Sequence, residues 1–492
     1  MPNAASNDAE AQQAGKTCLL QLLIWLAALT GIRIAGNALA NTDLFFDEAQ
    51  YWFWSRELAF GYFSKPPLIG WIIRGATELC GSGEACVRAP SALFHAGTAI
   101  LVFFIAKSLY DARIGFWAGL SYATLPGVSL SSSLISTDAP LLFFVALALL
   151  SLVKLREAEG WRWALLLGLA IGFGFLAKYA MVYFLMCLAI ALVWIRPWRG
   201  LLGDVRLYAA LALGFAILAP NIIWNIQHSF ATFSHTADNA NWGGSLIKPL
   251  KALEFAGGQF GVFGPILFAF LLVYCVRWFL SSPLRDEGGD HVRLLLAFSV
   301  PVILLMTAQA LLSRANANWA AFAYVAATVL TVAVLMRGGW RRLLRLSLAI
   351  HLAVATLIPV GGVLAGSFTL PGGADPYSRI LGWKELADRV GARAEQDGYK
   401  TIATDRRALA AELLYYLRDS GILIVSLRGD GPPGDHFEMT RPLTDTTPSP
   451  VLVVSYNEDG PAGSRLLGSE DVAAGPSTSR RIYFHALESS GQ

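Results

Sequence analysis

Eleven apolar runs of about bilayer length dominate the chain between residues 18 and 366. A helix that crosses the hydrocarbon core of a membrane needs about 20 apolar residues. The runs lie at 18–38, 89–106, 114–130, 139–153, 163–177, 179–195, 207–223, 258–280, 294–312, 319–336 and 344–366. Charged residues make up only 15% of the 492 residues, and the mean hydropathy is +0.50. The sequence therefore predicts an all-α polytopic membrane protein of about eleven transmembrane helices.

Lysine and arginine gather in alternate breaks between these runs, and such an excess marks the cytoplasmic side. The breaks that are rich in lysine and arginine are therefore expected to be cytoplasmic, which places the N-terminus inside the cell. The same distribution also favours a break at Lys178 over one long helix across 163–195. The first run is expected to be an uncleaved anchor, although Ala38-Leu39-Ala40 resembles a signal-peptide cleavage site. Two long segments, 39–88 and about 370–492, then face the periplasm.

The sequence divides into a membrane core, 1–369, and a soluble C-terminal domain, 370–492. In the C-terminal part, helix-like stretches at 383–395 and 406–417 alternate with short apolar strands at 422–426, 451–455 and 482–485. Alternation of the two periodicities is typical of a small α/β domain. We therefore expect a periplasmic α/β domain after the last span.

The net charge of +3 is too small for a nucleic-acid partner, and no basic run accompanies it. The five cysteines fit no metal-site spacing. Cys80 and Cys86 are close together in the first outer loop, in a compartment that permits disulfides. A local disulfide and a free pair both remain open from the sequence.

The first outer loop, 39–88, holds the densest chemistry. Asp47 and Glu48 stand side by side among aromatic residues, and Lys65 is followed by two prolines. Carboxylates at a membrane surface are costly to desolvate, and residues kept at that cost are often functional. The alternative is an interfacial helix with Asp47 as its N-cap and the aromatics as a membrane belt.

Four segments, taken in order, resemble the bacterial GT-C glycosyltransferases of the family 39/83 type. These are relatives of the dolichyl-phosphate-mannose protein mannosyltransferases and of the lipid A aminoarabinose transferases. The segments are Asp47-Glu48, Gly61-Tyr62-Phe63-Ser64-Lys65-Pro66-Pro67, Ser136-Thr137-Asp138-Ala139-Pro140 and Leu176-Ala177-Lys178-Tyr179. A weaker likeness continues at Asp405-Arg406-Arg407 and at 414–418.

The resemblance implies a GT-C membrane core that transfers a sugar from a polyprenyl-phosphate donor to a lipid-linked acceptor. Lipid A and the lipopolysaccharide core are the expected acceptors, on the periplasmic face of the bacterial inner membrane. A protein O-mannosyltransferase-like enzyme is the nearest alternative. A lipid-linked sugar transporter or flippase is the alternative from another class, although the charges gather on one face of the chain instead of at mid-membrane.

Such a transfer needs a base for the attacking hydroxyl and cations for the departing phosphate. By the resemblance, Asp47 is the catalytic base, with Glu48 beside it, and Lys65 faces the phosphate. Tyr51 lines the site if the stretch is helical, and Tyr62 is a further candidate. The aminoarabinose transferases carry a glutamate where this chain has Ser64. This difference weakens the inference that the chain has the metal site that those enzymes can form there.

The remaining candidates lie at the outer ends of later runs. Asp138 begins one run, where it is either a site residue or a helix N-cap. Lys178 either snorkels outward or faces a cavity. His228 and His235 would lie on one side of a helix two turns apart, and Arg314 suits a lipid phosphate. No cofactor is certain: a divalent metal remains open, because two histidines lack a third ligand.

Overall fold

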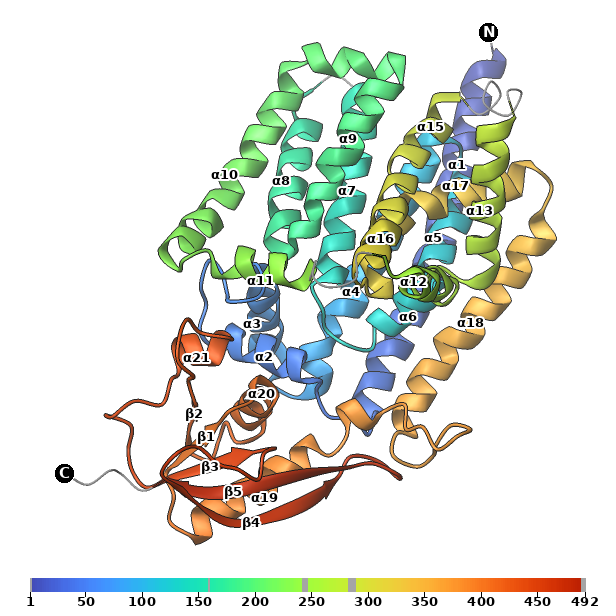
Figure 1. Cartoon of the computed structure of the whole chain (residues 1–492). Coiled ribbons are helices and arrows are strands. Elements are labelled where there is room, and N and C mark those ends of the chain that lie inside the picture. The colour runs from blue at the N-terminus through green and yellow to red at the C-terminus, as the bar shows by residue number, and fades with distance from the viewer. Residues whose placement is uncertain (1, 158–159, 241–246, 282–288, 488–492) are drawn as a thin grey trace. The chain divides into compact units, whose positions relative to one another are not determined.

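The computed structural model describes residues 2–157, 160–240, 247–281 and 289–487 (Figure 1). The chain forms two compact units. The helical unit comprises 1–35 and 88–358, and the outer-loop unit comprises 36–87 and 359–492. The predicted boundary at 369 stays a prediction, and the predicted first outer loop shares a compact unit with the C-terminal segment.

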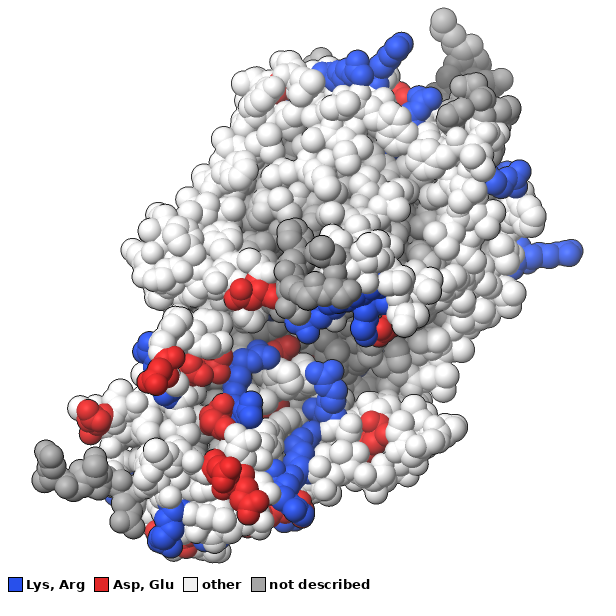
Figure 2. Space-filling view, in the orientation of Figure 1, with Lys and Arg blue, Asp and Glu red and all other residues white. Residues whose placement is uncertain are grey.

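Long helices build the helical unit, and its visible face carries few charged side chains between the ends of the helices (Figure 2). The helices are α1 (Pro2–Leu39), α4 (Glu84–Leu109), α5 (Ala112–Thr124), α6 (Pro126–Ser131), α7 (Asp138–Glu157), α8 (Arg162–Ala177), α9 (Val182–Trp194), α10 (Val205–Gln227), α11 (Ala231–Ala240), α12 (Pro249–Val262), α13 (Pro265–Leu280), α15 (Gly289–Ala297), α16 (Val300–Leu312), α17 (Ala323–Arg337) and α18 (Arg341–Val363). Short 3-10 turns are η1 (Tyr179–Met181), η2 (Arg196–Gly203) and η3 (Ala317–Ala320).

Six of the described helical segments are long and apolar enough to cross a membrane, or up to eight if each of two bent pairs is one span. The eleven predicted spans are therefore not confirmed, although a multi-pass membrane protein is. The run predicted at 258–280 bends by 119° between α12 and α13. Gly264 lies at the bend with φ +89°, a backbone region that glycine enters without steric cost, and Pro265 starts the next helix.

Small residues let α8 and α10 approach closely. A Cβ added at Gly172 would lie 2.6 Å from the Cβ of Ile217, and one added at Gly168 would lie 2.8 Å from the carbonyl oxygen of Ala210. Packing of this kind replaces hydrophobic driving force between helices in lipid. The break after α8 is confirmed, because Lys178 has extended backbone angles (φ −162°, ψ 135°).

The outer-loop unit combines helices from both ends of the chain with a five-stranded sheet. Its helical segments are α2 (Phe46–Arg56), α3 (Leu68–Cys80), η4 (Ser378–Ile380), α19 (Trp383–Gln396), α20 (Arg407–Tyr416) and α21 (His436–Thr440). Its strands are β1 (Thr401–Thr404), β2 (Leu423–Ser426), β3 (Val451–Ser455), β4 (Ser464–Ala473) and β5 (Ser479–Leu487). The strand order is β2-β1-β3-β5-β4. Strands β2, β1 and β3 are parallel, and β5 runs antiparallel to both β3 and β4.

The predicted C-terminal α/β domain is confirmed in its described part. Buried side chains of α19 and α20 pack with Ile402 and Leu452 on one face of the sheet, and Ala403 and Val453 alternate onto the other. The sequence missed β1 and β4. Strand β1 is only four residues long, and β4 is largely polar and exposed.

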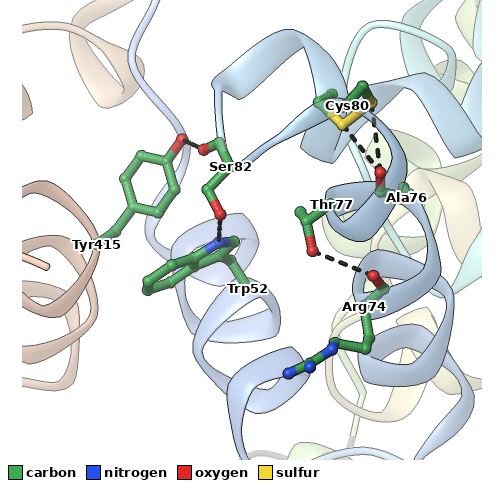
Figure 3. The surroundings of a disulfide bond; sticks show 8 residues. Trp52, Arg74, Ala76, Thr77, Cys80, Ser82 and Tyr415 are labelled. Carbon is green, nitrogen blue, oxygen red and sulfur yellow. Dashed lines mark hydrogen bonds between the residues drawn. A yellow bond between two sulfur atoms is a disulfide. The ribbon is translucent and has the colours of Figure 1, made fainter.

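A disulfide joins Cys80 at the end of α3 to Cys86 at the start of α4 (Figure 3). It closes a short loop that contains Ser82. The Ser82 hydroxyl accepts a hydrogen bond from Trp52 Nε1 at 3.0 Å, and its carbonyl oxygen accepts one from the Tyr415 hydroxyl at 2.5 Å. The bridge thus stabilises a loop that contacts both α2 and α20.

Candidate functional site

Asp47 and Glu48 occupy the first turn of α2, where the helix dipole favours carboxylates. Phe45 is the N-cap, so the interpretation of Asp47 as the cap is wrong. Glu48 is 1% exposed, and its Oε2 accepts a hydrogen bond from Phe45 N at 2.9 Å, which closes a capping box. Glu48 is therefore held in the helix cap, and of the two carboxylates Asp47 is the more accessible, with a side chain 36% exposed.

An arginine from the C-terminal segment contacts Asp47. Arg407 Nη1 donates to Asp47 Oδ1 at 2.8 Å and to Gln50 Oε1 at 3.1 Å. Its guanidinium carbon also lies 4.8 Å from the ring centroid of Phe46. A carboxylate and a guanidinium therefore meet inside the outer-loop unit, at the first turn of α2.

The sheet positions Arg407. Strand β1 ends at Thr404, and the Oδ2 of Asp405 accepts hydrogen bonds from Ser455 Oγ at 3.0 Å and Asn457 Nδ2 at 3.2 Å, both at the end of β3. Helix α20 begins two residues later and packs against α2. The Asp405-Arg406-Arg407 segment thus lies at the carboxyl edge of the parallel strands.

The other candidates of the first outer loop are largely buried. Tyr51 is 4% exposed and its ring centroid lies 5.1 Å from that of Trp54. Tyr62 is 1% exposed, stacks on Trp54 at 4.5 Å, and donates to the Trp54 carbonyl at 2.8 Å. Burial raises the pKa of Tyr62 above its ordinary range. Lys65 is half-buried, and its carbonyl accepts a hydrogen bond from Tyr62 N at 3.1 Å. Tyr62 thus shapes the loop that carries Lys65.

A second polar cluster lies in the helical unit. Lys178 Nζ lies 2.6 Å from Asp138 Oδ1, with side chains 22% and 13% exposed. The other carboxylate oxygen, Oδ2, accepts a hydrogen bond from Asn318 Nδ2 at 2.8 Å. The structure therefore joins two predicted site residues into an ion pair and adds Asn318, which ties η3 to the start of α7.

A cavity of about 340 Å³ lies beside this cluster, and Asp138 and Asn318 contribute to its lining. Much of the remaining lining is apolar. His95 contributes as well, and its ring nitrogens lie 3.2 Å from the Tyr122 hydroxyl and 2.9 Å from Ser131 Oγ. A few polar groups beside an apolar cavity suit an amphipathic ligand.

The two histidines do not share a helix, so that prediction is wrong. His228 is the C-cap of α10 and stacks on Trp224 at 4.0 Å, whereas His235 lies on α11. Ser229 and Phe230 have positive φ angles, which turn the chain between the two helices. Arg314 is exposed just after α16.

No group of three or more His, Cys, Asp or Glu residues that could hold a metal ion occurs among the residues that the structure describes. The two clusters consist of carboxylate, amide, ammonium and guanidinium groups. Their chemistry is proton transfer and the binding of anions.

The chain resembles a lipid A galacturonosyltransferase, RgtD, of Rhizobium johnstonii. The two sequences are 40% identical over 398 residues, which cover 81% of this chain and 82% of that protein. The chain belongs to the GT-C glycosyltransferases that modify lipid A. A family model described as dolichyl-phosphate-mannose-protein mannosyltransferase matches residues 64–224 of this glycosyltransferase.

Other relatives share parts of the chain or its fold. An undecaprenyl phosphate-alpha-4-amino-4-deoxy-L-arabinose arabinosyl transferase of Pseudomonas aeruginosa is 28% identical over 315 residues. The match spans 62% of this chain but only about half (54%) of that protein. The crystal structure of ArnT from Cupriavidus metallidurans in the apo state superposes with a TM-score of 0.65 at 15% identity, covering 96% of this glycosyltransferase and 98% of ArnT. The shared fold is therefore of the GT-C type.

Sequence reasoning missed Arg407, Gln50 and Asn318 as members of these clusters. Arg407 lies in the weaker part of the family likeness, but its pattern alone does not indicate a partner. Gln50 is an uncharged residue in an aromatic stretch, and Asn318 is an uncharged residue in the short break between the runs 294–312 and 319–336. The partners of Arg407 and Asn318 are distant in sequence, and Gln50 contacts both the distant Arg407 and Ser64, 14 residues away.

Proposed function

We propose that the protein transfers a galacturonosyl residue from a polyprenyl-phosphate donor to lipid A. The observation that carries the proposal is the 40% identity, across four-fifths of both chains, with a lipid A galacturonosyltransferase. The name of the Pseudomonas aeruginosa relative supports an undecaprenyl-phosphate carrier. The excess of Lys and Arg in alternate breaks supports a cytoplasmic N-terminus and a reaction at the periplasmic face of the inner membrane.

In this proposal Asp47 acts as the general base. It takes the proton of the acceptor hydroxyl as that oxygen attacks the anomeric carbon of the sugar. The bond between the anomeric carbon and the phosphate oxygen breaks, and polyprenyl phosphate leaves with the electron pair. Lys65 stabilises the charge on the departing phosphate. The exposure of Asp47, against the burial and capping contact of Glu48, supports this division of roles.

The Asp138 cluster supports a second contact with the donor. Lys178, although paired, remains 22% exposed, and the adjoining cavity is largely apolar. A phosphate joined to an isoprenoid chain combines the two chemistries. Lys178 is therefore proposed to bind the donor phosphate, with Asp138 as its paired carboxylate and with His228, His235 and Arg314 as outer phosphate contacts.

Mass spectrometry of cells lacking the gene tests the function. Lipid A, core oligosaccharide and total glycoprotein are compared after complementation with wild type, Asp47→Asn or Glu57→Gln. Glu57 is the matched control, because it also pairs with an arginine of the C-terminal segment, Arg441, at 2.7 Å. We expect a hexuronic acid to disappear from lipid A and to return with wild type and Glu57→Gln only.

Other outcomes of this experiment identify the alternatives. Loss of a sugar from the core or from glycoprotein would assign a different acceptor. Full restoration of the product by Asp47→Asn would contradict Asp47 as the base and would favour either a different catalytic residue or transport of a lipid-linked sugar.

A further inference from the structure

The contact between Arg407 and Asp47 is built by several groups. One nitrogen, Nη1, donates to both Asp47 Oδ1 at 2.8 Å and Gln50 Oε1 at 3.1 Å. The guanidinium also lies over the ring of Phe46, 4.8 Å from its centroid. Gln50 is 1% exposed, and its Nε2 lies 3.5 Å from Ser64 Oγ, next to Lys65. A buried amide therefore connects the guanidinium to the segment that carries the proposed phosphate-binding lysine.

The position of Arg407 in its own helix is electrostatically unfavourable. It is the first residue of α20, where the helix dipole is positive and a cation is disfavoured. Partners on α2 compensate: Asp47 supplies negative charge, Phe46 supplies the face of a ring, and Gln50 supplies a carbonyl oxygen. The residue thus gains its favourable contacts from the proposed catalytic helix and not from its own.

The contact also determines how Asp47 presents its two oxygens. Oδ1 accepts the hydrogen bond from Arg407, whereas Oδ2 accepts none from the residues that the structure describes. A base must direct one lone pair at the proton that it takes. With Oδ1 held, Oδ2 is the oxygen available to an acceptor hydroxyl.

We propose that Arg407 is a positioning residue for the glycosyl transfer. It holds Asp47 in one orientation, with Gln50 fixing the guanidinium from the side of the Lys65 segment. The C-terminal domain thereby contributes to the rate of the chemical step. The proposal rests on the proposed role of Asp47 as the base.

A second arginine offers a matched control. Arg441 Nη2 lies 2.7 Å from Glu57 Oε1, and its guanidinium lies 4.9 Å from the ring centroid of Phe53. Both arginines join the C-terminal segment to α2 or its immediate neighbour, with similar side-chain exposures of 34% and 31%. They differ in that only Arg407 contacts Asp47.

The test measures kcat and KM of the purified full-length chain with a polyprenyl-phosphate-galacturonate donor and lipid A. For Arg407→Gln we expect kcat to fall by about 10- to 100-fold, because misplacement of a catalytic group by about 1 Å costs up to about 10²-fold. KM for both substrates should change by less than about threefold. Arg441→Gln should keep kcat within about twofold of wild type. Arg407→Lys should recover part of the activity, because an ammonium keeps the charge but not the fork geometry.

Gln50→Leu extends the test to the amide. If Gln50 acts by fixing Arg407, the double variant Gln50→Leu/Arg407→Gln should have the kcat of Arg407→Gln alone. Thermal unfolding and limited proteolysis report whether the C-terminal domain still folds. If Arg407→Gln fails to fold, Arg407→Lys and Gln50→Leu carry the test.

Three results would overturn the proposal. Equal losses in Arg407→Gln and Arg441→Gln would reduce Arg407 to a docking contact. A raised donor KM with unchanged kcat would make it a donor-binding residue. Normal kinetics in Arg407→Gln, together with an inactive Asp47→Asn, would refute the positioning role and leave the proposed function intact. An active Asp47→Asn would instead refute the role of Asp47 as the base, on which this proposal rests, whereas an absence of transfer by the wild type would refute the proposed function itself.

Discussion

Removal of the ammonium group of Lys178, which forms an ion pair with Asp138, should separate a structural role of Lys178 from a donor-binding role. In Lys178→Met, the carboxylate that faced Nζ at 2.6 Å loses its cation. At that distance the bare attraction is about 1.6 kcal/mol in water and about 6 kcal/mol at an effective dielectric constant of about 20, before desolvation is subtracted. Exposed pairs contribute less than about 1 kcal/mol, whereas breaking a buried pair costs about 3–5 kcal/mol.

The Asp138 pair lies between these limits, because the two side chains are 13% and 22% exposed. We therefore expect Lys178→Met to lower the free energy of unfolding by about 2 kcal/mol. For a large unit, each kcal/mol shifts Tm by about 2 °C, so Tm in detergent should fall by about 4 °C. Lys154→Met is the control: its partner Glu157 is on the same helix, at 2.8 Å, with exposures of 30% and 38%. Its Tm should change by about 1 °C or less.

The double variant Asp138→Asn/Lys178→Met removes both charges and keeps an acceptor for Asn318. We expect it to regain most of the lost Tm while transfer activity stays low, since Lys178 is proposed to bind the donor. Recovery of activity together with Tm would refute that role and leave Lys178 as a structural partner. An unchanged Tm in Lys178→Met would refute the calculated magnitude.

Three further predictions concern stability. Gly172→Ala places a methyl group 2.6 Å from the Cβ of Ile217, so it should lower the free energy of unfolding by about 1–3 kcal/mol and lower Tm in detergent. Gly31→Ala is the control: Gly31 has open space around it, so this variant should not lower Tm. The double variant Cys80→Ser/Cys86→Ser should have a free energy of unfolding about 2 kcal/mol lower than wild type, because the unfolded chain is no longer closed into a loop. A reductant should lower the Tm of wild type to that of the variant and leave the Tm of the variant unchanged. Burial raises the pKa of Asp43 despite two backbone N–H donors, so stability from this group is present at low pH and lost as the pH rises through its folded pKa. The Tm of Asp43→Asn should therefore rise relative to the Tm of wild type as the pH increases above about 4. A difference in Tm that stays constant with pH would contradict this prediction.

Local physical chemistry accounts for the parts that the sequence predicted. The apolar runs became helices because a helix satisfies its own backbone hydrogen bonds, which a membrane requires. The break at Lys178 followed from the distribution of charge. Two adjacent carboxylates, which lie at the start of α2, identified the region around Asp47.

The same reasoning was weaker where a turn or a bend intervenes. The run at 258–280 was counted as one span, and Gly264 bends it by 119°. His228 and His235 were placed on one helix, and the positive φ angles of Ser229 and Phe230 separate them. Strand β4 was missed because its exposed edge lacks an apolar pattern. Hydrophobic patterning reports burial, and these features depend on backbone angles or on strand pairing.

The sequence by itself determined the class of this protein, a multi-pass GT-C glycosyltransferase, and the segment that carries its proposed base. Only the tertiary structure decided the partners of the charged residues. Arg407 meets Asp47 across 360 residues, and Asn318 meets Asp138 across 180. The local sequence does not specify these partners, because an exposed arginine or asparagine side chain is stable in water without a protein partner. Folding brings the chain segments together, and the low dielectric constant of the folded protein then makes the pairing specific.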